Sequence, residues 1–312
     1  MTHDRRFRFG IQAATAPSGA EWAALARKVE DLGYSSLMIP DHFGDQWAPI
    51  PALTAAALAT TTLRVGALVF DNDYRHPVVL AKEAATLDLL SGGRLELGLG
   101  AGWMNTDYEQ SGIPQDRAGV RVERMQEAIA VLKGCFAPGA FSYEGKHYKI
   151  TGFDGLPKPV QQPSPPLLIG GGAQRVLSIA AREADIVGVN PSIPSGAVDA
   201  SAARTGVASE TDRKLSWIRS AAGDRYPEIE LNMLVFAVNV TKDRSAALAQ
   251  LASMFGADAA EMDDFPHTLF GTVNQICEQL QQARARWDVS YWIVQADAID
   301  AMAPVVAALN GQ

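Results

Sequence analysis

Strand-like and helix-like segments alternate along nearly the whole chain. Apolar, strand-like segments cover 7–14, 35–42, 63–70, 94–102, 167–172, 184–190, 229–240 and 290–296. Helix-like segments lie between or after them, over 18–33, 51–61, 76–93, 117–134, 173–184, 212–223, 272–287 and 297–309. Apolar strands separated by helices predict a parallel sheet that helices cover. About eight such units suit an α/β fold of the (β/α)8 TIM-barrel type, which needs about 250 residues plus insertions. An open doubly wound sheet is the alternative.

Two stretches interrupt the alternation. Residues 136–165 contain a hairpin-like segment that turns at Glu144-Gly145, followed by the proline-rich "LPKPVQQPSPP". We interpret this stretch as an insertion after the fourth strand. A polar, Ala/Ser-rich stretch over 192–211 is expected to be a mobile loop, so further insertions fall in the later loops. Since no proline- or charge-rich linker divides the sequence, we expect a single domain over 1–312.

Charge and composition exclude several classes of partner. The formal net charge is −8, which disfavours nucleic acid or an anionic membrane as the main partner. No apolar run approaches the ~20 residues of a membrane span, and the start of the sequence lacks an apolar signal core, which predicts a cytoplasmic protein. Cys135 and Cys277 lie far apart with no Cys/His cluster, so we expect reduced thiols and no metal site.

The C-terminal ends of the strands are where a barrel of this type carries its chemistry. These ends fall at Gln12-Ala13, Asp41-His42, Phe70-Asp71, Gly98–Trp103, Gly170–Gly172, Asn190 and Gln295. Histidine side chains can exchange protons near neutral pH, so His42 could serve as a general acid or base, or simply bond to the neighbouring loop. Asp41 could orient His42 or cap the next helix, and capping is favoured.

Two glycine-rich exits stand out among these strand ends. "LLIGGGAQ" places Gly170, Gly171 and Gly172 between a strand and a helix that begins near Ala173, where free N–H groups and the helix dipole suit a phosphate. A flexible turn is the alternative. "RLELGLGAGW" gives GxGxG instead of the dinucleotide-binding GxGxxG, and taken alone it favours a tight strand exit over a ligand-approach site. Trp103 and Phe43 could wall a flat ring or pack at the rim.

With these stretches assembled, the sequence resembles the luciferase-like flavin and deazaflavin oxidoreductases. The resemblance rests on "DLGYSSLMIPDHF", "RHPVVLAKEAATLDLLSGGRLELGLGAGWMNTDYEQSGIP", "PPLLIGGGAQRVLSIAAREADIVGVNP", and "FGTVNQICEQL" followed by "VSYWIV". These stretches occur in one consistent order between about residues 7 and 309. Within the family, the chain is similar to the actinobacterial branch that uses coenzyme F420, a deazaflavin.

The resemblance implies a TIM barrel with the cofactor ring over its mouth. It implies a non-proline cis peptide within Ala67-Leu68-Val69, at the end of the third strand, which would support the ring. His42 matches the histidine near the ring and is the expected catalytic residue. The expected cofactor contacts are Asp41, Ala67, Leu68, Val69, Asn105, Gly170, Gly171, Gly172 and Ala173, whereas Phe43 and Trp103 are expected on the substrate side.

The function implied is an F420-dependent oxidoreductase that moves a hydride between the deazaflavin and an organic small molecule. Trp103 and Met104 stand where sugar-phosphate dehydrogenases of the family carry an acidic residue, so the substrate is expected to be apolar. One alternative is an FMN-dependent two-component monooxygenase, with a reductase that supplies reduced flavin. Another is a non-catalytic flavin-binding protein. The family's habit suggests a homodimer.

Overall fold

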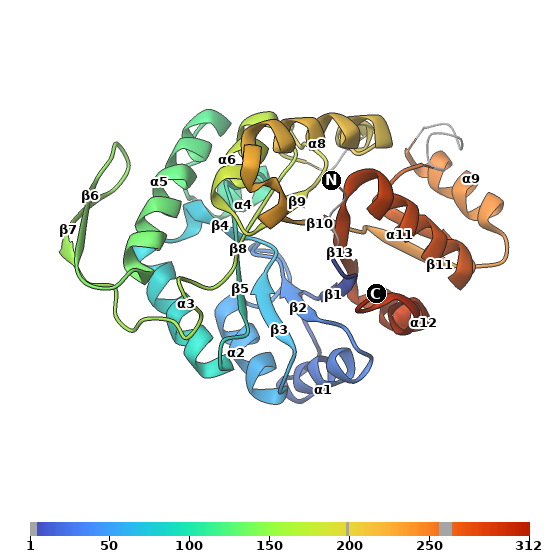
Figure 1. The fold of residues 1–312 in the computed structure, drawn as a ribbon, viewed down its shortest axis with the longest axis horizontal. Coiled ribbons are helices and arrows are strands. Elements are labelled where there is room, and N and C mark those ends of the chain that lie inside the picture. Colours follow the sequence, from blue (N-terminus) through green and yellow to red (C-terminus); the bar gives the residue numbers. More distant parts are fainter. Residues whose placement is uncertain (1–4, 198–199, 256–263) are drawn as a thin grey trace.

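A closed parallel barrel forms the centre of the molecule (Figure 1). The computed structural model describes residues 5–197, 200–255 and 264–312. The sheet order is β3-β2-β1-β13-β10-β9-β8-β5-β4, and β3 also pairs with β5, so the sheet closes on itself. Because β3 and β4 both pair with β5, they occupy one position of a (β/α)8 barrel. The strands are β1 (Arg8–Gln12), β2 (Ser36–Ile39), β3 (Arg64–Ala67), β4 (Phe70–Asp71), β5 (Leu95–Gly100), β8 (Leu167–Gly171), β9 (Ile186–Val189), β10 (Glu230–Leu234) and β13 (Val289–Gln295).

Helices surround this barrel, and local signals in the sequence set several of their ends. Ser18 caps α1 by accepting from the N–H of Glu21, Pro77 opens α3, and Gly92 ends α3 in the left-handed region with φ 68°. None of the helices in the described ranges is long and apolar enough to cross a membrane. The main helices are α1 (Gly19–Asp31), α2 (Pro49–Ala59), α3 (Pro77–Ser91), α4 (Asn105–Ser111), α5 (Ala118–Phe136), α6 (Gln174–Glu183), α7 (Ala200–Arg204), α8 (Ala208–Ala222), α9 (Arg244–Phe255), α11 (Val273–Trp287) and α12 (Ile299–Leu309).

Two small sheets lie outside the barrel. The antiparallel pair β6 (Phe141–Glu144) and β7 (Lys149–Phe153) is the hairpin that the sequence predicts after the fourth strand. The parallel pair β11 (Ala237–Val240) and β12 (Thr268–Gly271) corrects the sequence analysis, which treated 229–240 as one strand. The stretch 192–211 also holds more structure than predicted, since it includes α7 and the start of α8.

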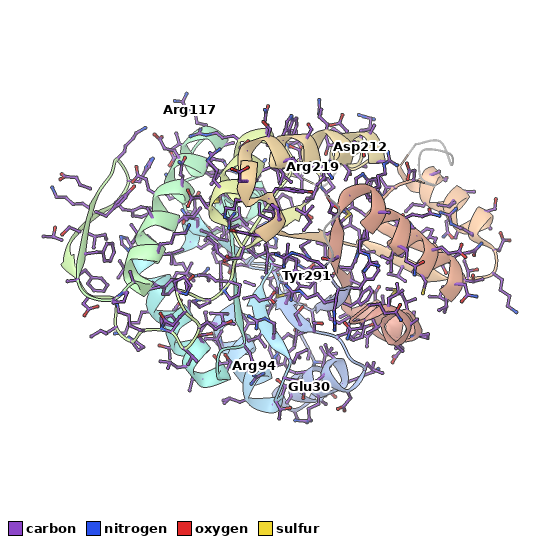
Figure 2. The ribbon with its side chains drawn as sticks, viewed as in Figure 1. Glu30, Arg94, Arg117, Asp212, Arg219 and Tyr291 are labelled. Atoms are coloured by element: carbon purple, nitrogen blue, oxygen red, sulfur yellow. The ribbon has the colours of Figure 1, made fainter. Side chains whose placement is uncertain are left out.

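Side chains alternate between the inside and the outside of the barrel. Met38, Leu168, Tyr291 and Ile293 belong to the apolar cluster within the barrel, and Figure 2 places Tyr291 at its centre. Trp292 and Val294, on the opposite face of β13, pack instead in the large cluster between the sheet and the helices. This alternation assigns Gln295 and, on β1, Gln12 to the inner face at the C-terminal end.

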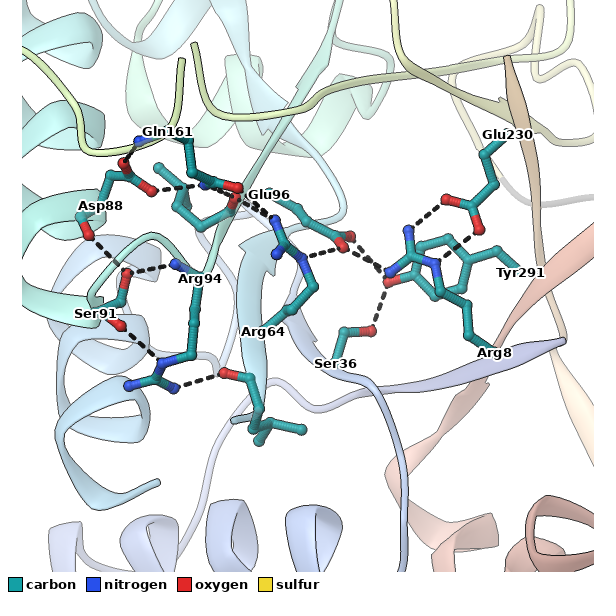
Figure 3. A network of polar contacts seen from close by, with 12 residues as sticks. Arg8, Ser36, Arg64, Asp88, Ser91, Arg94, Glu96, Gln161, Glu230 and Tyr291 are labelled. Atoms are coloured by element: carbon teal, nitrogen blue, oxygen red, sulfur yellow. Dashed lines mark hydrogen bonds and ion pairs between the residues drawn. The ribbon is translucent and has the colours of Figure 1, made fainter. Parts of the chain in front are cut away.

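An ionic network fills the N-terminal end of the barrel (Figure 3). Glu96 accepts from Arg8 at 2.6 Å and from Arg64 at 2.7 Å, and Arg8 also binds Glu230 at 2.6 Å. Burial alone would raise the pKa of Glu96, but the two guanidinium groups hold it below its ordinary value. The hydroxyl of Tyr291 donates to Glu96 at 3.1 Å. These contacts occupy the interior of the barrel at its N-terminal end.

Candidate functional site

A histidine–aspartate pair lies at the C-terminal mouth of the barrel. His42 follows β2, and its Nδ1 lies 2.6 Å from Oδ2 of Asp107, in the first turn of α4. Oδ1 of Asp107 accepts from the backbone N–H of Phe43 at 3.2 Å. Asp107 is only 4% exposed, whereas His42 is half-buried. The carboxylate therefore fixes the ring and favours the tautomer with its proton on Nδ1, and no described residue hydrogen-bonds to Nε2.

Aromatic side chains surround this pair. The rings of Trp103 and His42 meet edge to face, with centroids 5.5 Å apart, and Phe43 packs on Tyr74 at 4.4 Å. Tyr74 donates its hydroxyl to Oδ2 of Asp107 at 2.9 Å. Burial raises the pKa of Tyr74 far above its ordinary value, and the carboxylates of Asp71 and Asp107 raise it further, so its hydroxyl stays a donor. Trp103 thus packs against His42 and Phe43 against Tyr74, and their contact with a substrate stays a prediction.

The structure corrects both expectations for the side chain of Asp41. Asp41 neither orients His42 nor caps α2, because its carboxylate binds Arg75 at 2.5 and 3.2 Å. It also accepts from the backbone N–H of Asp71 at 3.0 Å. Asp41 therefore ties the end of β2 to the end of β4, and its predicted contact with a cofactor stays a prediction.

The Leu68–Val69 peptide is cis, at the position that the resemblance predicted. It separates β3 from β4, and glycines on the neighbouring strand β5 leave space for it. A Cβ at Gly98 would overlap the carbonyl oxygen of Ala67, and one at Gly100 would lie 2.6 Å from Cγ2 of Val69. The glycines of "GLGAGW" therefore make room for this bulge of the chain itself, which explains why β5 loses its side chains there.

The glycine-rich junction between β8 and α6 lies close to where the sequence predicts, but Gly170 and Gly171 are the last residues of β8, and only Gly172 and Ala173 lie between the strand and the helix. Ala173 is the N-cap of α6 and provides no side-chain hydrogen bond, so the exposed start of this helix suits an anion. The glycines also serve packing within the chain. A Cβ at Gly172 would lie 2.5 Å from backbone atoms of Pro191 and Ser192, and one at Gly171 would lie 2.6 Å from Val176.

Asn105 joins the loop after β5 to the loop after β9. Its Nδ2 donates to the carbonyl of Ser195 at 3.0 Å, and its backbone N–H donates to the carbonyl of Gly196 at 3.2 Å. Its Oδ1 accepts from Gln115 at 2.9 Å. Both polar atoms of the Asn105 side chain therefore bond to other residues of the protein, and its contact with a cofactor stays a prediction.

A buried aspartate also lies near the site, at the end of β4. Asp71 is 6% exposed and accepts from the N–H of Asp73 at 2.8 Å and from the hydroxyl of Tyr108 at 3.3 Å. Burial raises its pKa to about 7, and the carboxylates of Asp73 and Asp41 contribute in the same direction. Gly102, just before Trp103, has φ 72°, and a Cβ there would overlap Tyr108. Asp71 and Tyr108 therefore pack against Gly102, the residue before Trp103.

A cavity of about 770 Å³ lies elsewhere, beside α11 and β12. Its lining includes Leu269, Gln279, Arg286 and Trp292, and none of the residues predicted for the functional site. Since Trp292 points to the outside of the barrel, this cavity is separate from the mouth.

In comparison with known proteins, the chain matches one family model, and its relatives include a monooxygenase and a reductase. A family model described as luciferase-like monooxygenase matches residues 6–290. An FMNH2-dependent dimethylsulfone monooxygenase from Pseudomonas putida is 27% identical over 205 residues, which cover 66% of this chain and 53% of that protein. A 5,10-methylenetetrahydromethanopterin reductase from Archaeoglobus fulgidus is 30% identical over 187 residues, covering 60% and 54%. The matched stretches thus span about half the length of these relatives.

Solved structures with the same fold also include both kinds. The coenzyme F420-dependent tetrahydromethanopterin reductase of Methanopyrus kandleri aligns with a TM-score of 0.79 at 19% identity, covering 98% of this chain and 100% of that chain. The long-chain alkane monooxygenase LadA aligns with a TM-score of 0.76 at 15% identity, covering 97% and 92%. At these identities the likeness shows the fold.

Proposed function

Because the chain belongs to the luciferase-like monooxygenase family, as its sequence motifs predicted, we propose that it is an F420-dependent oxidoreductase acting on an organic, apolar small molecule. Relatives named as F420-dependent and as FMNH2-dependent both support an oxidoreductase. Deazaflavin, when bound, supplies or accepts a hydride at its C5 carbon, and the protein contributes positioning and proton handling.

The observation that carries this proposal is the His42–Asp107 pair beside Trp103. When a hydride reaches a carbon of a C=O or C=C–C=O group, the electron pair moves to oxygen, which then needs a proton. His42 can give that proton from Nε2 while Nδ1 stays bonded to Asp107, and it can take the proton back in the reverse direction. Asp107 holds the ring in place through Nδ1, so the pair acts as one acid–base unit.

The chain also offers groups that fit the two ends of such a cofactor. The uncapped start of α6 would hold its phosphate, together with the backbone of Gly170, Gly171, Gly172 and Ala173. Val69, which fills the space above Gly100, would support one face of the ring. Trp103 and Phe43 would then contact the substrate.

FMN has a similar ring and a phosphate, so the two-component monooxygenase with a partner reductase is the second candidate. It is supported by the relative from Pseudomonas putida. Titration of the purified protein with F420 and with FMN, followed by cofactor fluorescence, separates the two. Saturable micromolar binding of F420 supports the proposal, whereas saturable binding of FMN alone contradicts it.

A non-catalytic flavin-binding protein is distinguished by His42→Ala. In an enzyme this variant loses turnover while it keeps cofactor affinity within about threefold of the unchanged protein. A cofactor carrier would show no turnover either before or after the substitution, and that outcome would contradict the proposal.

We also propose that the protein forms a homodimer through the outer faces of α2 and α3. Helix α2 carries no charged residue, and Leu58 on its outer face is 67% exposed. On the neighbouring α3, Val79 and Leu90 are 50% and 51% exposed. A helix that is apolar on all sides, as α2 is, is ordinarily covered, and a second copy of the chain would cover α2 and the exposed apolar residues of α3 at once.

A further inference from the structure

Two glutamines form a bonded pair at the mouth of the barrel. Gln12 and Gln295 are the last residues of β1 and β13, and they are direct partners in the register of these strands. Nε2 of Gln295 donates to Oε1 of Gln12 at 3.1 Å, and Nε2 of Gln12 donates to the carbonyl of Leu68 at 3.1 Å. Both side chains are partly exposed on the inner face of the barrel.

The bonding partner at one end fixes the orientation of both carboxamides. The carbonyl of Leu68 can only accept, so Gln12 must point its nitrogen toward it and its oxygen toward Gln295. Gln295 must then point its nitrogen toward Gln12. No group in the described ranges donates to Oε1 of Gln295. This oxygen and the second N–H of the same carboxamide together form a free edge with one acceptor and one donor.

This free edge lies close to the groups that the proposed function uses. Strands β13, β1 and β2 are consecutive in the barrel, and His42 follows β2. Gln12 binds the carbonyl of the same peptide that presents Val69. Strand β8, with the glycine loop, lies on the opposite side of the barrel.

We propose that Gln295, held in place by Gln12, binds a neutral ligand group in which an N–H and a C=O lie side by side, as in an amide, lactam or imide. A carboxamide edge is complementary to such a group, because each partner gives one donor and one acceptor. A carboxylate ligand would instead bring its lone pairs toward Oε1 and is disfavoured. This subsite rests on the proposed function, which places the ligand at the C-terminal mouth of the barrel. Two sources carry this chemistry, the organic substrate and the imide edge of the cofactor ring.

The test compares two small probes that differ in one donor. Binding of 2-piperidone and of N-methyl-2-piperidone is measured by ligand-observed NMR, with and without saturating F420. The variants are Gln295→Leu and Gln12→Leu, and the matched control is Gln279→Leu. Gln279 also donates to a backbone carbonyl, that of Thr268 at 2.9 Å, but it lies on α11 away from the mouth. Thermal unfolding identifies any variant that fails to fold.

We expect the unchanged protein and Gln279→Leu to bind 2-piperidone at least tenfold more tightly than its N-methyl analogue. Gln295→Leu should lose this preference, and Gln12→Leu should reduce it. If Gln295→Leu also weakens F420 or FMN at least tenfold, the imide edge of the ring is the source, and if cofactor affinity is unchanged, the substrate is. Equal binding of the two probes to the unchanged protein, together with unchanged cofactor affinity in Gln295→Leu, would overturn the subsite. Because the probes are also titrated without cofactor, failure to bind either cofactor would contradict the proposed function separately.

Discussion

Asp71 is expected to limit the stability of this protein above neutral pH. The side chain is 6% exposed, and no cationic group in the described part of the chain forms an ion pair with it. Arg75 pairs with Asp41 and Arg124 pairs with Asp73, so two further carboxylates lie nearby. Burial, followed by these like charges, raises the pKa of Asp71 from 3.8 to about 7.

The size and sign of the effect follow from that shift. A difference of about 3 pH units at about 1.4 kcal/mol each gives about 4 kcal/mol. The folded state holds the proton of Asp71 more tightly than the unfolded state does. Its contribution to stability is therefore fully present below about pH 4 and is lost as the pH rises through about 7. Above that pH, the folded protein carries the cost of an ionised, buried carboxylate.

The variant Asp71→Asn removes the ionisation and keeps an oxygen that accepts from the N–H of Asp73. We expect its free energy of unfolding to exceed that of the unchanged protein by about 4 kcal/mol at pH 8.5, and by less than half of that at pH 5. Urea denaturation at both pH values measures the difference. The control is Asp45→Asn at an exposed position, which should show no pH-dependent gap. A gap for Asp71→Asn that is equal at the two pH values, or that shrinks as the pH rises, would refute the reasoning.

The remaining predictions concern the His42 site, the ionic network at the N-terminal end of the barrel, and helix α2. Asp107→Asn removes the negative charge beside Nδ1 of His42 and leaves one oxygen where Nδ1 and the N–H of Phe43 now have two, so turnover should fall at least ~10²-fold while fluorescence titration gives a cofactor Kd within about threefold. Trp103→Ala should change steady-state turnover or KM about tenfold or more with the cofactor Kd again nearly constant, and unaltered kinetics would contradict its substrate-side role. Glu96→Gln removes the buried carboxylate that pairs with the half-buried Arg8 and Arg64 and should lower the free energy of unfolding by about 3 kcal/mol in urea at pH 7. The pKa of Glu96 is held low, so this contribution is present at neutral pH and disappears as the pH falls below about 4.5. Leu58→Glu should convert a dimer to a monomer in analytical ultracentrifugation, and a monomeric unchanged protein would contradict the dimer.

The sequence predicted the barrel well because local signals mark its elements. Ser18, Pro77 and Gly92 set helix ends through contacts within a few residues, and such contacts do not depend on the rest of the fold. The segment 229–240 was harder because its apolar residues continue without a turn signal. The chain leaves the barrel there because the N–H of Phe236 donates to the carbonyl of His267, a contact between distant segments. Periodicity along one strand does not contain that information.

Asp107 escaped the sequence analysis for a related reason. It lies in the first turn of a helix, where an acidic residue has an ordinary role next to the helix dipole. Its bond to His42 joins segments 65 positions apart, and the pairing of β2 with β3 and of β3 with β5 brings α4 to the loop after β2. Asp41, the acid next to His42 in sequence, was the nearer candidate, but Arg75 and the backbone of Asp71 take up its carboxylate. Adjacency in sequence therefore indicated the wrong partner.

The Leu68–Val69 peptide shows how several such long-range contacts build one feature of the mouth. The N–H of Leu68, which precedes this peptide, donates to the carbonyl of Ile39 on β2, and the Leu68 carbonyl within the peptide accepts from Gln12 on β1. Its Val69 side chain fits over Gly100 on β5, where any Cβ would displace it. Three strands thus fix the position of one bulge, and each contributes a different kind of contact. A larger residue at 100 would consequently move Val69 first, so that β5 would shape the proposed ligand site through the bulge it supports.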